Sequence, residues 1–234
     1  MGRWLQTLVL TANWVVAARP CGSVVIFLIS GSSAIAVRFP VRIGPSPAVR
    51  GCRLTYLELD RRISQLARAL LGLGLKKGDF LGVMLWNEHA VVETIFACAR
   101  AGIIVAPLNV RLLAEEVVPY VNFHGCKAIV TNADFEEKFE KADATIRIST
   151  SGNEGWLEYE SLISGESGEP LTVVTSLDDP VRLVSTGGTT GMSKGVLHSH
   201  VGTLFTVLAD IAEYGADAAT SARLRFFLSF CFWR

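Results

Sequence analysis

Residues 184–195 of this chain read VSTGGTTGMSKG. These twelve residues include four glycines, three threonines, two serines and one lysine. Glycines allow the backbone to turn at positive φ and to approach a bulky anion closely, and successive backbone N–H groups then form an anion-binding concavity. Hydroxyl groups add neutral donors, and a lysine adds a mobile positive charge. This composition predicts a loop that holds the phosphate groups of a nucleotide.

Apolar residues surround this loop in the sequence. The run VRLV at 181–184 precedes it and GVLH at 195–198 follows it, which predicts a strand on each side. A Walker A loop has glycine directly before its lysine and serine or threonine directly after it. Here Ser193 precedes Lys194 and Gly195 follows it, so that motif is excluded. Clusters of glycine, serine and threonine also mark ordinary connecting loops, which is the alternative interpretation.

Two stretches upstream add to this signal. The loop and the residues after it read STGGTTGMSKGVLHSH at 185–200, and the upstream stretches are RLTYLEL at 53–59 and GIIVAPLN at 102–109. They resemble the phosphate-binding signature and the R-x-T-Y-x-E-L and G-x-x-x-x-P-L-N segments of the adenylate-forming superfamily. That superfamily contains acyl-CoA synthetases, related AMP-dependent ligases and luciferases. The stretches occur in the family's order, and the resemblance covers about residues 52–213, with Ser193 where the family usually has proline.

The resemblance implies a fold and a set of ligand contacts. The implied fold is α/β, part of the large N-terminal domain of the adenylate-forming fold, with a mainly parallel sheet flanked by helices. The residues that match the family's phosphate-binding positions are Thr186, Gly187, Gly188, Thr189, Thr190, Gly191 and Lys194. Their threonine and lysine side chains would hold the β- and γ-phosphates of ATP, and the backbone N–H groups of 187–191 would assist.

Members of this family use Mg²⁺ and ATP to convert a carboxylic acid into an acyl-adenylate, and then transfer the acyl group to a thiol, commonly that of coenzyme A. The resemblance implies the same partners here. The family's main catalytic residues, its Mg²⁺ ligand and its C-terminal domain are expected beyond residue 234, so no catalytic or metal-binding residue is assigned. We therefore expect a fragment without full ligase activity. Two alternatives stay open, namely a non-catalytic nucleotide- or acyl-binding module and a truncated product without function.

Composition limits the other classes of function. Half of the 234 residues are hydrophobic, and 22 basic residues balance 22 acidic ones, so no charge excess points to nucleic acid. The five cysteines are scattered and form no C-x-x-C pair, which predicts neither a zinc site nor a disulfide framework. A reducing, cytoplasmic location fits this pattern best.

Both ends of the chain differ from its middle. No acidic residue precedes Glu58, whereas six arginines do, and the last nine residues contain four phenylalanines. Residues 1–50 fit a targeting peptide, a membrane segment or sequence foreign to the family. The uncharged run at 21–37 is shorter than the about 20 residues that span a bilayer, which counts against a membrane segment. We favour foreign sequence, because the polar helix and hairpin that precede the T-Y-x-E-L segment in the family it resembles are not legible here, although the apolar segment leaves membrane association open. The predicted divisions are an atypical extension over 1–50, a partial adenylation domain over 51–215 and an atypical tail over 216–234.

Hydrophobic periodicity predicts alternating helices and strands between the first motif and the loop. Helices are expected from the capping box Thr55-x-x-Glu58 to Gly72 and over 88–100, 112–123, 134–141 and 158–163, and strands over 80–85, 103–107, 127–131 and 145–149. The residues expected to face inward from the second helix are Val91, Val92, Ile95, Phe96 and Ala99. Pro119 is unfavourable by about 3 kcal/mol inside the third helix unless that helix starts late or kinks. The alternation predicts an α/β fold with a largely parallel sheet.

Four other residues are expected to have structural roles and no role in ligand binding. His89 and His124 are expected to be surface or satisfied loop histidines, and Met84 and Trp86 to be core residues.

Four residues leave a functional role open. Asn109 and Arg111 follow a predicted strand at its carboxyl end, where α/β proteins bind ligands. His198 and His200 are expected to alternate on the strand after the loop, where one of them would face the acyl site.

Overall fold

The structure is a computed structural model of the 234-residue chain. It describes residues 9–11, 14–18, 24–30, 33–39, 54, 56–171, 173, 175–186, 194–203 and 205–206. Only the backbone is described for the residues up to 39 and for 56, 57 and 186.

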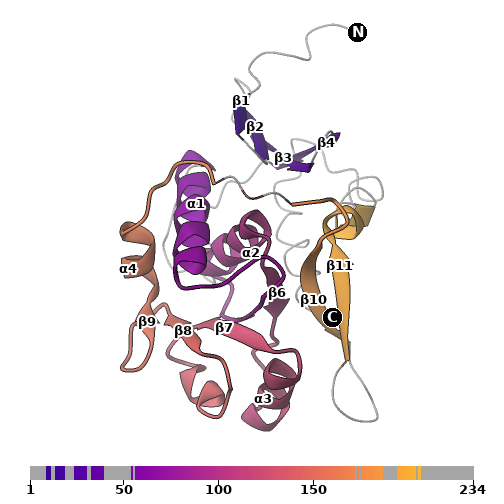
Figure 1. Ribbon diagram of the computed structural model, residues 1–234. Helices are drawn as coiled ribbons and strands as arrows, with labels where there is room; N and C mark the ends of the chain where they lie inside the picture. Colours follow the sequence, from indigo (N-terminus) through magenta and orange to yellow (C-terminus); the bar gives the residue numbers. More distant parts are fainter. Residues whose placement is uncertain are drawn as a thin grey trace, which may run out of the picture.

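A small antiparallel sheet of four consecutive strands comes first in the chain. Its strands are β1 (Val9–Thr11), β2 (Trp14–Ala18), β3 (Val24–Ser30) and β4 (Ser33–Phe39). Each strand pairs with the next one, in the order β1-β2-β3-β4 (Figure 1).

A seven-stranded sheet forms the centre of the described chain. Its strands are β5 (Phe80–Met84), β6 (Ile104–Pro107), β7 (Cys126–Thr131), β8 (Ile146–Ser149), β9 (Leu157–Glu158), β10 (Pro180–Thr186) and β11 (Lys194–Ser199). They lie in the order β11-β10-β6-β5-β7-β8-β9. All neighbours are parallel except β10 and β11, which are antiparallel. The predicted α/β fold with a mainly parallel sheet is confirmed.

Helices cover both faces of this sheet. They are α1 (Tyr56–Gly72), α2 (His89–Ala101), α3 (Ala114–Phe123), α4 (Tyr159–Ser164) and the 3₁₀ helix η1 (Glu136–Phe139). Figure 1 shows α1 and α2 on one side of the sheet and α3 on the other. Side chains of successive strand residues point to opposite faces, so Val105 packs beneath α1 and α2, whereas Ile104 and Ala106 pack beneath α3.

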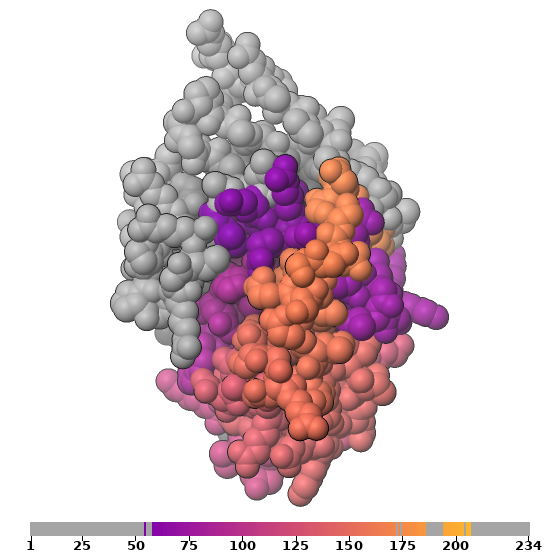
Figure 2. Space-filling model, turned by 90° about the vertical axis from the view of Figure 1, so that its left-hand side faces the viewer, coloured from indigo at the N-terminus to yellow at the C-terminus, as the bar shows by residue number. Residues whose placement is uncertain are grey.

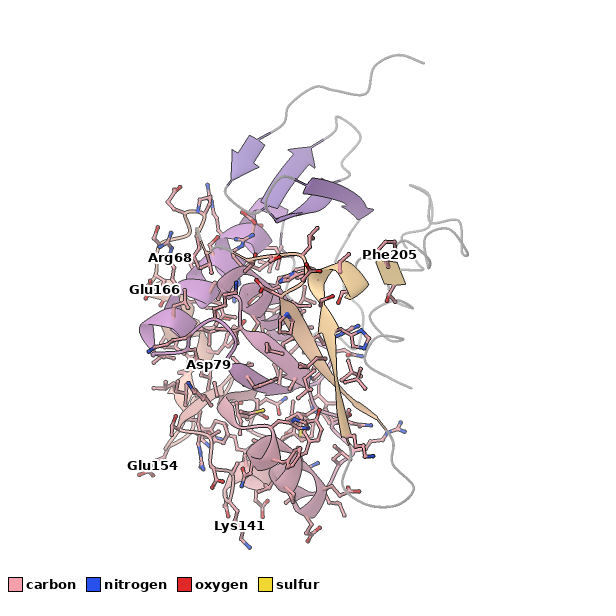
Figure 3. The ribbon with its side chains drawn as sticks, turned by 45° about the vertical axis from the view of Figure 1, so that its right-hand side comes forward. Arg68, Asp79, Lys141, Glu154, Glu166 and Phe205 are labelled. Carbon is pink, nitrogen blue, oxygen red and sulfur yellow. The ribbon has the colours of Figure 1, made fainter. Side chains whose placement is uncertain are left out.

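The segment after α4 is tied to α1. Gln65 Nε2 donates a hydrogen bond of 2.9 Å to the carbonyl of Glu166, and Arg68 donates to the carbonyls of Glu169 and Pro170 at 3.2 and 3.0 Å. Figure 2 shows this orange segment lying across the purple helix, and Figure 3 shows Arg68 and Glu166 close together. These bonds hold the connection that leads toward β10.

The first helix ends as predicted, at Gly72. It begins at Tyr56, directly after the residue predicted to cap it. That residue, Thr55, lies outside the described residues, so the cap hydrogen bond stays a prediction.

The buried face of α2 differs from the predicted one. Of the five residues expected to face inward, only Ala99 is buried, and the other four are partly buried at the margin of the core. The fully covered positions are mostly small, and they include Ala90, Ala97 and Ala101, which let the helix lie close to its neighbours. Glu93 is also completely buried there, because partners from two other helices satisfy its carboxylate.

The third helix starts late, at Ala114. Leu113 has no side-chain acceptor, but the Glu116 carboxylate accepts the N–H of Leu113 at 2.9 Å. Pro119 lies within the helix and removes the bond to the carbonyl of Glu115. Glu115 and Pro119 are both exposed, so the carbonyl that loses its partner lies at the surface and not in the core.

The predicted helix over 134–141 is wrong. The chain forms only the four-residue 3₁₀ helix η1 there. Asn132 starts this turn because its Oδ1 accepts the N–H of Asp134 at 3.2 Å, and the N–H of Lys138 donates to the carbonyl of Phe135 at 3.1 Å. Phe135 and Phe139 are buried beneath α3, and that burial takes precedence over helix propensity.

Candidate nucleotide-binding site

The predicted strand–loop–strand around the glycine-rich stretch is confirmed. Strands β10 and β11 pair antiparallel, with Thr186 opposite Lys194 and Ser185 opposite Gly195. The loop at 187–193 lies outside the described residues. The structure therefore brings together Thr186 and Lys194, the first and last of the expected phosphate contacts. The contacts expected from Gly187, Gly188, Thr189, Thr190 and Gly191 stay predictions.

The hairpin opens at the edge of the sheet where α/β proteins bind ligands. Strand β10 is parallel to β6, with Arg182 beside Val105, so its last residue lies at the same edge as the carboxyl ends of β6 and β5. Ligands of open α/β sheets bind outside the carboxyl ends of the strands. The place of β10 and β11 in the fold therefore suits a nucleotide site.

Asn109 and Arg111 lie at this edge, as predicted. Both side chains are exposed after β6, and Asn109 Oδ1 accepts the N–H of Arg111 at 2.9 Å. The asparagine thus shapes its own turn, and a ligand contact from either residue stays a prediction.

The prediction for Trp86 is wrong, whereas Met84 is completely buried as expected. Trp86 follows β5 and is 49% exposed. Its Nε1 donates to Asp134 Oδ2 at 2.7 Å, and its ring lies 4.9 Å from that of Phe135. These two partners support the indole on the surface.

His198 and His200 do not share the strand, contrary to the prediction. His198 lies on β11 opposite Arg182, whereas β11 ends at Ser199 and His200 begins a helical turn. Burial lowers the pKa of His198, and the charge of Arg182 lowers it further.

His200 lies at the end of the hairpin away from the loop. It is 5% exposed, and its N–H donates to the carbonyl of Asp179, directly before β10, at 3.1 Å. Asp179 also forms an ion pair of 2.6 Å with Lys77. Burial lowers the pKa of His200, the charge of Asp179 opposes this change, and Lys77 adds to it. Figure 3 shows Phe205 at this same end.

The other two histidines differ from each other. His89 is partly buried, with Nε2 3.5 Å from Glu160 Oε1. His124 closes α3, and its Nε2 is buried without a hydrogen-bond partner among the described residues, so it is neither a surface nor a satisfied histidine. Its ring faces Gly195. This contact could not be predicted from the sequence, because no motif links the two residues.

Neither metal ligands nor reactive thiols stand out in the described part of the chain. It contains no group of three or more histidine, cysteine or acidic side chains that could hold a metal ion. Cys98 and Cys126 are free and buried, and burial raises the pKa of the Cys126 thiol to about 12. No helix among the same residues is both long and apolar enough for a membrane crossing.

Comparison with known proteins identifies the family. Residues 33–232 match the AMP-binding enzyme family, so the chain belongs to it. The chain is 32% identical over 162 residues to a feruloyl-CoA synthase of an Amycolatopsis species, covering 68% of this chain and 31% of that protein. It is 30% identical over 162 residues to a crotonobetaine/carnitine–CoA ligase of Escherichia coli O127:H6, covering 63% and 31%.

Solved structures show the same fold. The anthranilate CoA ligase AuaEII in complex with anthranoyl-AMP has a TM-score of 0.62 and 20% identity, over 65% of this chain and 31% of that one. Apo MatB from Rhodopseudomonas palustris has a TM-score of 0.62 and 23% identity, over 71% and 34%. The chain thus spans about a third of the length of the relatives it matches. The boundaries at 51 and 215 within the matched region stay predictions.

Proposed function

We propose that this chain supplies the ATP-phosphate-binding part of an enzyme that activates a carboxylic acid as an acyl-adenylate and transfers the acyl group to coenzyme A. Membership of the AMP-binding enzyme family supports this proposal, together with relatives that are CoA ligases. The single observation that carries it is the hairpin that places Thr186 and Lys194 opposite each other at the carboxyl edge of a parallel sheet.

The chemistry of the donors fits a triphosphate. Activation of the acid moves negative charge onto the phosphate oxygens, and fixed donors lower the barrier by stabilising that charge. Backbone N–H groups, hydroxyls and the Lys194 ammonium are such donors. In the proposed role they orient the phosphates and neutralise charge, without forming a covalent bond to the substrate.

We include Mg²⁺ in the proposal only as the ion that accompanies ATP as Mg-ATP. The described residues hold no cluster of metal-ligating side chains, so we assign no ligand and derive no step through the ion. A cytoplasmic location is also part of the proposal, because five scattered cysteines suit a reducing compartment.

A panel of carboxylic acids in a pyrophosphate-exchange assay tests whether the chain activates an acid and which one. The purified chain is incubated with ATP, labelled pyrophosphate and aromatic, short hydroxylated or fatty acids, and label entering ATP is counted. We propose that the 234-residue chain alone gives no exchange, because its aligned part covers only 31% of the feruloyl-CoA synthase relative. Robust exchange with any acid would contradict this part of the proposal and at the same time name the substrate.

A second candidate is a nucleotide-binding module without catalysis. The pairing of Thr186 with Lys194 favours it, because these residues are expected to hold phosphates without taking part in covalent chemistry. Calorimetric titration with ATP distinguishes it from a product without function. ATP binding that is lost in Lys194→Ala and occurs without turnover would support a non-catalytic module. No ATP binding at all would contradict both the proposed enzyme function and the module.

A further inference from the structure

The strand that carries Lys194 is supported from one side. Among the described residues β11 is the last strand of its sheet, bonded to β10 alone. Val196 and Leu197 on this strand are 46% and 53% exposed. The backbone pairing of Lys194 with Thr186 and the contacts of the adjoining residue, Gly195, therefore contribute to the position of Lys194.

Gly195 lies directly against the end of α3. A methyl group at this position would lie 2.5 Å from Leu183 Cδ1, 2.8 Å from His124 Cε1 and 3.0 Å from His124 Nε2. Real Cβ atoms essentially never approach other heavy atoms closer than 3.0 Å. The close approach of the imidazole edge thus requires glycine at 195.

The imidazole itself is firmly held. The backbone N–H of His124 donates to the carbonyl of Tyr120 at 3.1 Å, and its ring lies 4.5 Å from the Tyr120 ring and 5.0 Å from the Phe123 ring. Burial lowers the pKa of His124, so the ring is neutral near pH 7. Neither its Nε2 nor the Tyr120 hydroxyl has a hydrogen-bond partner among the described residues. The ring therefore acts on Gly195 by its shape.

We propose that His124 is a positioning residue for Lys194. Its ring fixes Gly195 and, through it, the backbone of Lys194 at the carboxyl edge of the sheet. This inference rests on the proposed function, which gives Lys194 a phosphate to hold. Helix α3 thereby takes part in phosphate binding although its residues lie far from the loop in the sequence.

The test measures the affinity of the 234-residue chain for inorganic tripolyphosphate by calorimetry. Gly195→Ala forces strand and ring apart, and we expect it to weaken binding about tenfold, in line with the cost of overpacking. In His124→Ala/Gly195→Ala the flexible end of Leu183 moves into the space of the missing ring. The double variant should therefore bind about three- to tenfold more tightly than Gly195→Ala, a coupling typical of residues in contact.

Control variants separate positioning from general damage. Gly72→Ala adds a methyl group with no atom within 4 Å, and His89→Ala removes a partly buried ring on α2. Both should bind tripolyphosphate like the unaltered chain. Thermal unfolding of every variant identifies those that remain folded at the titration temperature, and tripolyphosphate affinities are compared only among these, so that loss of stability is separated from loss of positioning.

The outcomes distinguish this inference from the proposed function. If Lys194→Ala weakens binding but Gly195→Ala does not, or if the double variant binds no better than Gly195→Ala, His124 has no positioning role. If Lys194→Ala itself leaves tripolyphosphate binding unchanged, the proposed function fails and the inference fails with it.

Discussion

The middle of the sheet and its β10–β11 edge are built in different ways. In the inner strand β7, Ala128 and Ile129 are completely buried, one on each face, beneath different helices. At the edge, Val196 and Leu197 remain about half exposed, although they follow the residues expected to hold ATP. We expect the middle to give the fold most of its stability, and in the proposed function the edge presents backbone and side-chain donors to a ligand. Substitutions in the two regions should therefore affect different measurements.

The largest effect is expected in the middle. Ile129→Ala removes most of a side chain that is completely buried beneath α3, and such truncations cost about 2–5 kcal/mol of unfolding free energy. Urea denaturation followed by circular dichroism measures this loss. The matched change at the edge, Val196→Ala, should stay within about 0.5 kcal/mol, and a similar loss in both variants would remove the proposed difference between the regions.

A smaller loss is expected where α1, α2 and α4 meet. The Tyr159 hydroxyl donates to the buried Glu93 carboxylate at 2.8 Å, and Arg62 also donates to Glu93 at 2.7 Å. Burial lowers the pKa of Arg62, but hydrogen bonds and charge from Glu160 and Glu93 outweigh it and raise the value above normal. Tyr159→Phe should cost about 1–3 kcal/mol, because a buried carboxylate loses a donor. An unchanged urea midpoint would show that Arg62 alone satisfies Glu93.

The smallest effect concerns pH and the far end of the hairpin. Burial holds the pKa of His200 below its ordinary value of about 6.5, so the unfolded chain binds more protons at mildly acidic pH. The stability contributed by neutral His200 is present above pH 6.5 and is lost as the pH falls. Urea midpoints between pH 7.5 and 5.5 should decline less steeply in His200→Asn. An equally steep decline would assign the effect to other groups.

The same contrast explains what the sequence could predict. Local patterns were sufficient for the α/β class with its mainly parallel sheet, for the end of α1 at Gly72 and for the strands on both sides of the loop. The chain's motifs also led to the AMP-binding enzyme family. These features depend on neighbouring residues, periodicity and turn chemistry, which a single sequence displays.

Contacts between distant segments were not predictable in this way. The burial of Glu93 depends on Arg62 and Tyr159, which belong to other helices. The contact between His124 and Gly195 joins the end of α3 to β11, and no sequence pattern near either residue indicates the other. Trp86 was expected in the core because its size favours burial, whereas its bond to Asp134 holds it at the surface.

In the proposed function the Lys194 hairpin binds the phosphates of ATP. Calorimetric titration of ATP into the unaltered chain and into Lys194→Ala tests this role most directly. Loss of a charge-assisted contact of about 1.5–3 kcal/mol corresponds to roughly 10- to 150-fold weaker binding. Lys141→Ala removes the same charge from an exposed position away from the hairpin, and it should bind ATP like the unaltered chain. The account predicts selective loss in Lys194→Ala, whereas equal ATP affinity in all three proteins would contradict it.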